Sequence, residues 1–568
     1  MKIEQIHVVN YRNFSNAIVN FTSSTLIIGA NDVGKTNLIH GIRLLLDKSL
    51  SERDIEPSET DFHISDDGQQ AEEFSITIGF DDVNEDAVLS ILKGHVSDDA
   101  KTVFKIIGYR KSLDYKILVG ESETELEEVT SRFYLKYINL RYVNAQRNLH
   151  KFIETEKKHL LKISQNETAE DNREEDQKQL TKIGRSLNIV NERVRKLNYV
   201  KDSTNLVNDE LKKLAHTYHD YEVHLDSGSI QVQQFIDDLK LNASTNGSKM
   251  LLGGDGRNNQ ILLALWKAKS QREFNPEHEV VIYCIEEPEA HLHPHQQRKL
   301  ASYLINELPG QTILTTHSPQ ITEQYTPDSI INIIKRGSYS YAASNGCSNC
   351  ISGSWDNLGY RMSILPAEAF FAKAVFLVEG PSEKLFYTEL AKSLNLNLDY
   401  YNISILSVDG VQFDVYVNVL KALEIPWVIR TDNDVFKVTE NKIEKRNLAG
   451  INRCLSLLGI EKLPHRNITT TSLSLLSFGT WSTISAIINP QGAYLAKVDL
   501  ETDLSFELPT ELLAYTGKKT FDEAISYLAG KKAIRMREFL SSAKGSLRTL
   551  ENGELARPLF DCVEKAKM

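Results

Sequence analysis

Cysteine is scarce in this sequence of 568 residues, which contains only five. So few cysteines cannot form the disulfide framework that holds small secreted domains together. Only Cys347 and Cys350 have the CxxC spacing, and a tetrahedral zinc site would need a second pair nearby, whereas Cys454 lies far along the chain. We therefore expect Cys347 and Cys350 to lie in a loop that holds no metal.

Long apolar runs and a basic leader are also missing. No run of about 18 apolar residues is present, which excludes an ordinary membrane-spanning helix. The first residues, MKIEQIHVVNYRNF, alternate in polarity and do not form a basic segment followed by an apolar one. This pattern argues against a secretory signal, so we expect a cytoplasmic protein that does not enter a membrane.

Positive charge is the third scarcity, since 65 lysines and arginines face 77 aspartates and glutamates, for a net charge of −12. This balance excludes a protein that coats nucleic acid through a uniformly positive surface. Any contact with DNA has to be local, and clustered carboxylates that hold multivalent cations can restore attraction to phosphate. At roughly 150 residues per domain, the length predicts three or four domains.

Short apolar strands alternate with turns in the first part of the chain, as in IEQIHVVN, STLIIG, EFSITIGF, KTVFKIIGYR and YLKYINLRYV. With the helix-like KTNLIHGIRLLLDKSL, these segments predict a mixed α/β fold. From about residue 150 to 221 the sequence becomes charged and poor in glycine. Apolar residues recur there at steps of three and four, namely Leu180, Ile183, Leu187, Val190, Val194 and Leu197. This spacing is typical of a coiled-coil seam for self-association, or of a helix that packs on its own domain.

The α/β alternation returns with VVIYCIEEPE, HPHQQRKLASYLINEL and QTILTTH, so the helical segment is interpreted as an insertion. SYSYAASNGCSNCISGSWDN is the best linker candidate. Beyond it, AKAVFLVEG, SEKLFYTELAKSL, ISILSVDG, QFDVYVNVLKAL and WVIRTDND predict a βαβαβ unit, whose site should lie at the carboxyl ends of its strands. The predicted parts are a first α/β domain at 1–150 and 226–345, the insertion at 151–225, a linker at 346–365 and the second α/β domain at 366–568.

A phosphate-binding loop is the strongest motif of the first domain. Gly29 to Thr36 read GANDVGKT, which matches G-x-x-x-x-G-K-[ST] and lies between a strand and a helix as that loop requires. The glycines let backbone N–H groups face phosphate, the lysine reaches the β- and γ-phosphates, and the threonine hydroxyl binds Mg²⁺. The nucleotide-binding residues predicted here are Gly29, Asn31, Gly34, Lys35, Thr36 and Asn37.

A second acidic element completes this nucleotide site. The strand VVIYCI runs into Glu286 and Glu287, so Glu286 is expected near Mg²⁺ and Glu287 is expected to act as the general base for water. His317, after QTILTT, can reach the γ-phosphate. The alternative is that these acids only favour the dipole of a following helix.

Carboxylates gather at the strand ends of the second α/β domain. Glu379 follows AVFLV, and Asp432 and Asp434 follow PWVIR, so two parallel strands deliver acids to one edge of a sheet. Such acids repel one another unless they hold divalent cations, for which Mg²⁺ or Mn²⁺ is the natural choice. Two such ions suit phosphodiester hydrolysis. The alternative is a set of solvated acids that only happen to follow strands.

The first domain resembles a known group of ATPases. YRNF at Tyr11 to Phe14, together with GANDVGKT, IEEPEAHLHP and TTHSP, is similar to the ABC-type heads of RecF and SMC proteins. Those heads usually carry aspartate at the place of Glu286 and an LSGGQ-like signature where this chain has LLGGDGRNNQ. The resemblance therefore implies ATP binding, with hydrolysis that is slow or conditional.

The second α/β domain resembles Toprim domains, which are Rossmann-like, and a head fused to Toprim is identified as a member of the OLD family of nucleases. IEEPE, VEGPSEK, TDND, GINRCLSLLG and VDLETDL are similar to the nucleases of the Gabija anti-phage system within that family. The resemblance assigns metal binding to Glu379, Glu383, Asp432, Asp434, Asp499 and Glu501. It assigns the catalytic lysine to Lys532, with Lys531 as an equal geometric candidate.

The resemblance also implies a function and partners. It implies an ATP-regulated DNA endonuclease that uses Mg²⁺ or Mn²⁺, a helical insertion that makes a homodimer or tetramer, and a UvrD-like helicase partner, GajB in that system. The alternative from another class is an SMC- or RecF-like ATPase that clamps DNA without cutting it, although the insertion is short for such an arm. A topoisomerase or primase fits less well, because the chain has no strand-passing tyrosine domain and no zinc-binding domain.

Overall fold

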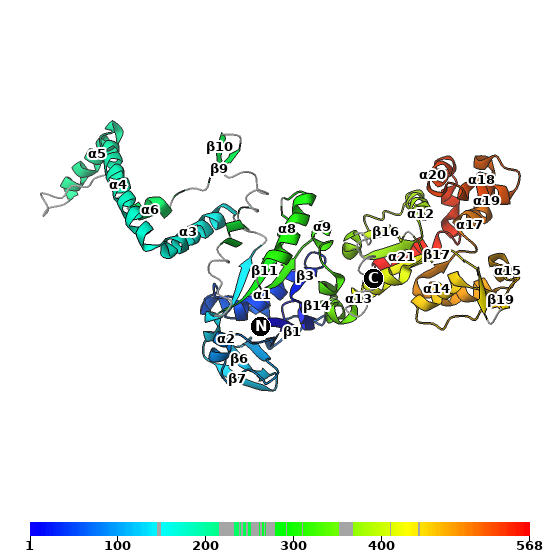
Figure 1. Cartoon of the computed structure of the whole chain (residues 1–568), viewed down its shortest axis with the longest axis horizontal. Coiled ribbons are helices and arrows are strands. Elements are labelled where there is room, and N and C mark those ends of the chain that lie inside the picture. The colour runs from blue at the N-terminus through cyan, green and yellow to red at the C-terminus, as the bar shows by residue number, and fades with distance from the viewer. Residues whose placement is uncertain are drawn as a thin grey trace. The chain divides into compact units, whose positions relative to one another are not determined.

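The computed structural model describes most of the chain. The described residues are 1–144, 149–214, 232–237, 239, 242–245, 248–251, 261, 264–265, 267–268, 279–290, 292–308, 310–351, 367–408, 410–440 and 443–567. The chain divides into two compact units, of which one comprises 1–145, 276–289 and 293–568 and the other comprises 146–275 and 290–292. Figure 1 shows the course of the chain.

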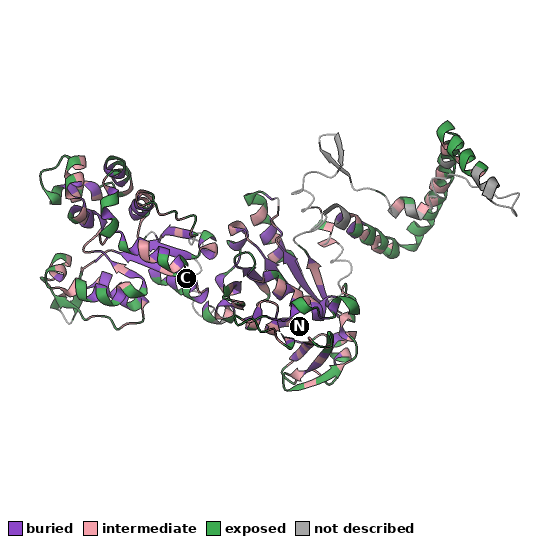
Figure 2. Cartoon of the chain, turned by 180° about the vertical axis from the view of Figure 1, so that it is seen from behind, coloured by how far each residue is buried: buried purple, intermediate pink, exposed green. Residues whose placement is uncertain are grey.

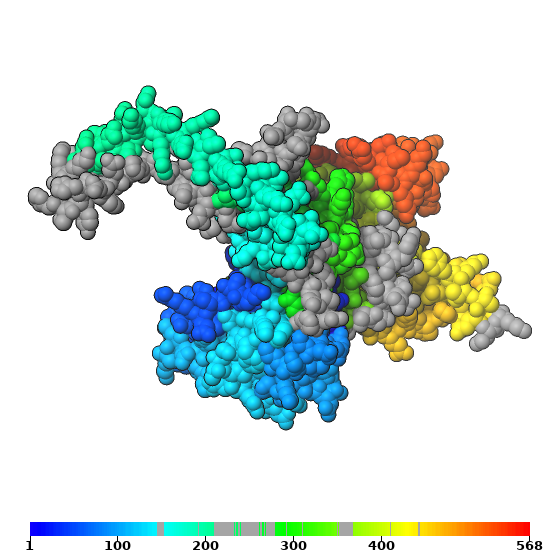
Figure 3. Space-filling view, turned by 60° about the vertical axis from the view of Figure 1, so that its left-hand side comes forward, coloured from blue at the N-terminus to red at the C-terminus, as the bar shows by residue number. Residues whose placement is uncertain are grey.

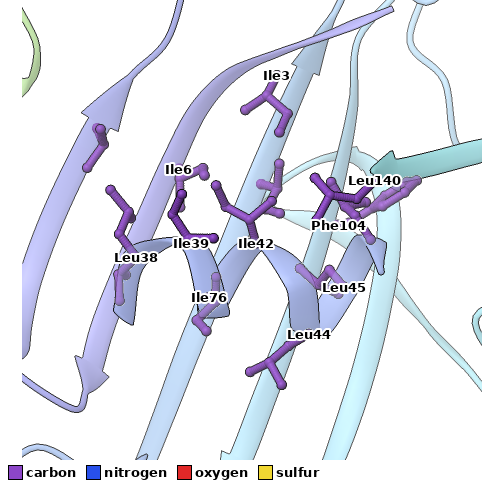
Figure 4. Close-up of a cluster of buried hydrophobic side chains, with 14 of the residues drawn as sticks. Ile3, Ile6, Leu38, Ile39, Ile42, Leu44, Leu45, Ile76, Phe104 and Leu140 are labelled. Carbon is purple, nitrogen blue, oxygen red and sulfur yellow. The ribbon is translucent and has the colours of Figure 1, made fainter. Parts of the chain in front are cut away.

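An antiparallel sheet of six strands begins the larger unit. Its order is β2 (Phe14–Asn20), β1 (Lys2–Tyr11), β4 (Glu73–Asp81), β5 (Thr102–Tyr109), β6 (Asp114–Ser122) and β7 (Glu125–Val129). Burial alternates along β5, as the two faces of a half-buried strand require. Helix α1 (Lys35–Leu46) lies against this sheet, and Figure 4 shows its side chains among those of Ile6, Ile76 and Phe104. This core fixes α1, whose first turn belongs to the phosphate-binding loop.

A second sheet of six strands carries that loop. Its order is β14 (Tyr339–Ala342), β13 (Ile330–Arg336), β3 (Ser24–Ile28), β12 (Gln311–Thr315), β11 (Val280–Glu286) and β8 (Ile138–Val143). All neighbours are parallel except β13 and β14. Every residue of β11 and β12 is buried, as expected where both faces of a parallel sheet are covered. The carboxyl ends of β3, β11 and β12 therefore meet at one edge.

The predicted α/β alternation of this region is confirmed, with α8 (Pro294–Glu307) between β11 and β12. One boundary differs from the prediction. The segment from Tyr134 begins as a 3₁₀ helix, η3 (Phe133–Lys136), and the strand starts only at Ile138. The ring of Tyr134 is fully buried and its hydroxyl donates to the Leu45 carbonyl, so tertiary packing decides the local conformation.

The C-terminal part of the larger unit is built on a parallel sheet of four strands. Its order is β16 (Ile403–Ser407), β15 (Ala374–Val378), β17 (Trp427–Thr431) and β21 (Ala493–Leu495). With α12 (Pro381–Ser393) and α13 (Phe413–Ala422), the predicted βαβαβ run is confirmed. All five residues of the central β15 are buried. The fourth strand, β21, was not predicted.

Two groups of elements follow β17 in the sequence. The first contains a three-stranded antiparallel sheet with three helices: β18 (Phe436–Glu440), β19 (Ile443–Asn447), β20 (Arg466–Asn467), α14 (Ala449–Leu457), α15 (Ser472–Ser477) and α16 (Thr480–Ile488). The second is helical: α17 (Leu500–Glu507), α18 (Pro509–Thr516), α19 (Phe521–Ala529), α20 (Lys532–Ala543) and α21 (Arg557–Lys567). The second group shares one hydrophobic core with β15 and α12, through residues such as Leu504, Leu528 and Phe539.

The smaller unit is mainly helical. Its elements are α3 (Leu149–Glu167), α4 (Glu170–Arg195), α5 (Asn198–Leu214), α6 (Val232–Asp237), β9 (Asn242–Thr245) and β10 (Ser248–Leu251). Much of the surface of α4 and α5 is exposed, as Figure 2 shows in green. Of the predicted seam, Leu180, Ile183, Leu187 and Val194 are half-buried, and Val190 and Leu197 are exposed. None of the helices described is both long and apolar enough to cross a membrane.

Two features predicted from the sequence fall wholly or largely outside the described residues. They are the LLGGDGRNNQ signature, of which only Leu251 is described, and most of the linker at 346–365, described up to Ile351. Each of the five cysteines is a free thiol, and the thiol of Cys347 is buried and contacts the carbonyl of Ala422 at 3.7 Å.

Candidate nucleotide and carboxylate sites

The phosphate-binding loop needs glycine at its two motif positions. Gly29 has φ 144°, and a Cβ atom there would lie 2.6 Å from the carbonyl oxygen of Ile333. Gly34 has φ 104°, and a Cβ atom there would overlap the side-chain amide of Asn13. Side chains other than glycine are strained in this region of φ, so the loop keeps its shape only with these residues. Asn31, between them, is exposed.

Lys35 is held inside the loop. Its ammonium group donates to the carbonyl oxygens of Gly29 at 2.9 Å and Ala30 at 2.8 Å. Burial lowers the pKa of Lys35, while the nearby carboxylate of Glu287 acts in the opposite direction. A partly desolvated cation within a loop of backbone N–H groups is suited to bind phosphate oxygens.

Thr36 and Glu286 meet as the sequence predicts. The Thr36 hydroxyl donates to Oε2 of Glu286 at 3.2 Å, and the Tyr142 hydroxyl donates to Oε1 at 3.0 Å. Burial raises the pKa of Glu286, which is 4% exposed. Tyr142, at the end of β8, was not predicted, since nothing in the sequence shows that β8 is the neighbour of β11.

Glu287 and His317 lie at the same sheet edge. Nε2 of His317 is 3.7 Å from Oε1 of Glu287, whose side chain is 44% exposed. Burial, with a smaller effect of Lys35, lowers the pKa of His317. Glu289 was not predicted as a site residue, although it belongs to the EEPE motif. Its Oε1 accepts from the Thr316 hydroxyl at 2.7 Å and from the His317 N–H at 2.8 Å, so it positions this histidine.

Residues of the YRNF segment form hydrogen bonds with Asn37, in the helix that follows the phosphate-binding loop. The side-chain amide of Asn37 donates to Oδ1 of Asn13 at 2.6 Å, and its oxygen accepts from the Arg12 guanidinium at 2.9 Å. The same guanidinium forms an ion pair with Asp61 at 2.9 Å. Both polar groups of Asn37 are thus bound within the protein, and they connect α1 with the turn between β1 and β2.

In the C-terminal sheet, two strand ends are joined directly. Oε1 of Glu379, after β15, accepts a hydrogen bond from the backbone N–H of Asp432, after β17, at 2.8 Å. It also accepts from the Thr431 hydroxyl at 2.5 Å. Parallel neighbours in one sheet bring their carboxyl ends together, and this contact is what that arrangement predicts.

Arg453, in α14, links two of the acids and was not predicted. Its guanidinium donates to Oε1 of Glu379 at 2.7 Å and to Oδ2 of Asp434 at 2.9 Å. The GINRCLSLLG motif contains Arg453, but no spacing in the sequence connects α14 with the ends of β15 and β17. The guanidinium offsets the charge of these two carboxylates.

Glu383 and Asp432 are acids in an unfavourable setting. Burial, despite the opposing effect of Arg430, raises the pKa of Glu383 to about 7. Burial and the neighbouring charges of Glu379 and Glu383 raise the pKa of Asp432 to about 9. Oε1 of Glu383 and Oδ1 of Asp432 are both buried, and no described residue donates a hydrogen bond to either oxygen. Such groups gain most from a cation or a proton.

A buried arginine balances part of this charge. Arg430, in β17, pairs with Asp503 at 2.7 Å and with Glu383 at 3.5 Å. Asp503 lies within VDLETDL but was not predicted as a site residue. Its place four residues after Asp499 in the helix α17 was the available signal.

The remaining predicted residues come from α17 and α20. Asp499 caps α17, and its Oδ1 accepts from the N–H of Thr502 at 2.7 Å. Burial and the charge of Asp499 raise the pKa of Glu501. Burial alone would lower the pKa of Lys532, but the charges of acids in the group raise it, with Glu501 first and Asp432 next. Lys531 precedes α20 as its N-cap residue.

These six acids, Glu379, Glu383, Asp432, Asp434, Asp499 and Glu501, are called the carboxylate cluster below. Among the residues described, no three acids, histidines or cysteines lie so that they could hold a metal ion as they stand. The cluster nevertheless offers the hard oxygen ligands that divalent cations prefer, and two of its buried carboxylate oxygens have no hydrogen-bond donor in the described part of the chain. Glu379 and Asp434 have Arg453 as a counter-ion, and Glu383 has Arg430.

Two family models match the chain. The model described as AAA ATPase domain matches residues 1–322, which is more than half of the sequence. The model described as "Overcoming lysogenization defect protein-like, TOPRIM domain" matches residues 370–434. The second match spans β15, α12, β16, α13 and β17, and so includes four of the six acids in the cluster.

Two curated proteins with similar sequences carry the names of nucleases. Endonuclease GajA of Bacillus cereus strain VD045 is 25% identical over 576 residues, which cover 95% of this chain and 95% of that protein. The OLD nuclease of Thermus scotoductus is 29% identical over 171 residues, or 28% of this chain and 32% of that protein. Among solved structures, an Smc head bound to a domain of ScpA aligns with a TM-score of 0.39 at 18% identity, over 60% of this chain and 97% of that one.

Proposed function

The chain belongs to the AAA ATPase domain family and carries an OLD-like TOPRIM domain, and from this we propose that it is an ATP-regulated, divalent-metal-dependent DNA endonuclease. The observation that carries the proposal is the contact between Glu379 and the backbone of Asp432, which brings the acids of two strands to one place. The similarity to endonuclease GajA over 95% of both chains supports DNA as the substrate.

The proposed chemistry is hydrolysis of a phosphodiester bond. Bound Mg²⁺ or Mn²⁺ ions would activate water and stabilise the leaving oxygen. Glu379, Glu383, Asp432 and Asp434 would hold one side of the metal site. Asp499 and Glu501 would hold the other side.

Lys532 is proposed as the catalytic lysine. Its pKa is raised by the charges of the cluster, so it carries its proton throughout the neutral range. A protonated lysine beside the acids can stabilise negative charge that develops on the phosphate. Lys531, the N-cap residue of α20, is the alternative candidate.

The N-terminal site is proposed to control this activity. Gly29, Gly34, Lys35 and Thr36 would bind the phosphates and Mg²⁺ of ATP, with Glu286 beside the metal. Glu287 would be the base for slow hydrolysis, and His317 would contact the γ-phosphate. ATP would hold the protein in a state that restrains cutting, which requires that it bind two arrangements of the protein with different affinity.

The proposed role is defence against phage in the cytoplasm, as in the Gabija system that the sequence resembles. The helical unit would form a homodimer or tetramer, and a UvrD-like helicase such as GajB would be the partner. The exposed apolar residues of α4 support self-association, and the helicase rests on the resemblance alone.

Cutting of plasmid DNA tests the proposal. Native protein with Mg²⁺ or Mn²⁺ should nick or cut supercoiled or linear plasmid, and Glu379→Ala should lower the rate at least about a hundredfold, because one of the metal ligands is lost. Glu368→Ala is the matched control, since Glu368 is an exposed acid outside the cluster. If native protein cuts no form of DNA with either metal, the nuclease proposal fails and a DNA-clamping ATPase becomes the better reading.

ATP control is tested in the same assay. Cutting by native protein should fall as ATP is added, and cutting by Lys35→Ala should not respond, because Lys35 is the phosphate ligand of the loop. Equal cutting at all ATP concentrations by both proteins would reject this control while leaving the nuclease intact.

A further inference from the structure

A groove lies beside the carboxylate cluster, between α13, α14 and the sheet of β18, β19 and β20. Its volume is about 1020 Å³. Basic and aromatic residues are prominent in its lining, namely Lys421, Lys445, Arg453, Lys462, His465 and Phe436. This surface is called the basic groove below. Of the residues that line it, only Arg453 belongs to the sites described above.

The charge of the basic groove is opposite to that of the whole chain. Four lysines and arginines line it against two acids, Asp414 and Glu440, in a protein whose net charge is −12. Lys445 and His465 both contact Glu440, at 3.0 Å and 3.1 Å, in a largely exposed group. Exposed ion pairs of this kind are weak and exchange readily for a phosphate partner.

Lys462 is the clearest unpartnered cation of the groove. It is exposed, and within the described part of the chain it makes no hydrogen bond or ion pair. Lys421 is already engaged, because its ammonium donates to the Leu457 carbonyl at 2.8 Å. Lys445 and Lys462 are therefore the side chains most available to a ligand.

Arg453 connects the groove with the carboxylate cluster. It lines the groove, and its guanidinium contacts Glu379 at 2.7 Å and Asp434 at 2.9 Å. The groove is thus no farther from the cluster than the length of one arginine side chain. In the space-filling view, the segment around β18 and β19 in yellow and the helices α18 to α20 in orange form separate projections (Figure 3).

An aromatic ring is exposed at the groove. Phe436, the first residue of β18, lines the groove and is 55% exposed. A ring of this kind beside lysines is the combination with which proteins bind a single nucleic-acid strand, because bases stack on the ring while phosphates contact the cations.

We propose that the basic groove binds one strand of the DNA substrate and leads it past Arg453 to the carboxylate cluster. The inference rests on the proposed nuclease function and names the path of its substrate. Lys445 and Lys462 contact phosphates, Phe436 stacks on a base, and Arg453 lies where the strand meets the acids. The volume of the groove, at the upper end of ordinary ligand pockets of roughly 300–1,000 Å³, suits several linked nucleotides better than one small ligand.

DNA binding without cutting tests the groove. The affinity of the full-length protein for a labelled single strand and a labelled duplex is measured by fluorescence anisotropy in EDTA, where no divalent metal supports cleavage. Lys445→Glu with Lys462→Glu should weaken binding about tenfold or more. It should also reduce the slope of log K against log salt by about two, one for each lost phosphate contact.

A matched double variant controls for net charge. Lys93→Glu with Lys373→Glu makes the same change at two exposed lysines, and Lys373 precedes β15 at the opposite edge of the sheet from the cluster. This variant should bind DNA nearly as tightly as native protein. Equal affinity and equal salt slope for the groove variant and the native protein would overturn the proposal.

The aromatic contact has its own test. Phe436→Ala should weaken binding of an ordinary single strand about fivefold or more, and should leave binding of an abasic strand unchanged, because only a base can stack. Equal losses for both strands would overturn the stacking role. A groove variant that loses binding of a mononucleotide and still binds DNA as native protein does would overturn the strand path, because the groove would then hold a small ligand.

The two proposals can fail separately. Binding of DNA that depends on the groove, together with no cutting in Mg²⁺ or Mn²⁺, would refute the nuclease and support the groove. Metal-dependent cutting by native protein together with unchanged DNA affinity of the groove variant would refute the groove and support the nuclease.

Discussion

At the scale of single residues, the carboxylate cluster lowers the stability of the folded protein, because acids are buried close together. Glu383 and Asp432 are carried to a buried edge, where burial and neighbouring acids raise their pKa values to about 7 and about 9. A site kept in this condition suggests function, because a core of apolar residues would be more stable. The same condition predicts how stability depends on pH and on metal.

Asp432→Asn should stabilise the protein in the absence of metal. Between the ordinary pKa of 3.8 and the raised value of about 9, folded Asp432 holds a proton that the unfolded chain has lost. Stability must therefore fall as pH rises through this window. The amide removes this dependence, so in EDTA at pH 8 the variant should gain on the order of 1 kcal/mol or more, measured by thermal or urea unfolding.

The metal response gives the control for that prediction. Mg²⁺ or Mn²⁺ should raise the Tm of native protein more at pH 8 than at pH 6, because protons compete with the cation for the carboxylates. The same cation should raise the Tm of Asp432→Asn by less than it raises the Tm of native protein. A native protein whose stability in EDTA is the same at pH 6 and pH 8 would contradict the proposed state of these acids.

Gly34→Ala should remove ATP binding, and Gly68→Ala should not. Both glycines have positive φ, at 104° and 81°, so alanine is strained by a similar amount in the backbone at each position. Only at Gly34 does the new methyl group overlap another residue, the Asn13 amide, whereas nothing lies within 4 Å at Gly68. Isothermal titration with ATP and thermal unfolding measure the difference. Similar ATP affinities for the two variants would show that the close contact with Asn13 is not needed.

At the scale of elements, parallel strands account for both sites. Five parallel strands in one sheet place Thr36, Glu286 and His317 at a common edge, and β15 and β17 do the same for Glu379 and Asp432. These residues are far apart in the sequence but close in space because βα units return each strand to the same end of the sheet. The helices then add Arg453 from α14 and Lys532 from α20.

The strand β11 delivers two acids whose environments differ, which predicts different roles. Glu286 is buried against Thr36 and Tyr142, whereas Glu287 is only half-buried and lies beside His317. Glu287→Gln should keep ATP affinity within a few fold and lower the rate of hydrolysis about a hundredfold or more, since it removes the base and keeps the shape. Single-turnover phosphate release measures the rate, and filter binding measures the affinity.

The matched change at Glu289 provides a control for Glu287→Gln. Glu289 binds the Thr316 hydroxyl and the His317 N–H, so Glu289→Gln should affect the position of His317 without removing a base. We expect a smaller loss of hydrolysis from Glu289→Gln. If Glu287→Gln hydrolyses ATP at the native rate, Glu287 is not the base.

At the scale of the whole molecule, the helical unit is separate from the unit that carries both sites. Its helix α4 exposes Ile189 and Val190, each more than half accessible to water. Val190 belongs to the spacing that is typical of a coiled-coil seam, and the proposed self-association would bury both residues against another copy of the chain. Because the helical unit and the two sites lie in different units, we expect that a substitution in one unit can be made without altering the other.

Val190→Asp should therefore weaken self-association without reducing stability. The mass of native protein and variant, measured by light scattering over a range of concentrations, should differ, with the variant shifted towards the monomer. Ser186→Asp, an equal charge change at an exposed polar position of α4, should leave the mass unchanged. A native protein that stays monomeric at all concentrations would contradict the role of this surface.

Much of this molecule could be predicted from sequence alone where the information is local. GANDVGKT, the acids after VVIYCI and the βαβαβ run from Ala374 were all assigned correctly to loops, strand ends and helices, because period and glycine placement depend on near neighbours. The choice between Lys531 and Lys532 could not be made in this way, because it depends on where each side chain lies relative to acids such as Glu501 and Asp432, which come from other elements.

The sequence by itself determined the phosphate-binding loop, the candidate acids, and the strands and helices that immediately carry them, since short-range patterning is enough for each. Only the tertiary structure decided that Arg453 bridges Glu379 and Asp434, that Arg430 pairs with Asp503, and that Tyr142 reaches Glu286. The physical reason is that hydrogen bonds and ion pairs act over a few ångströms. Residues tens of positions apart reach that distance only after strand pairing and core packing have placed their elements side by side.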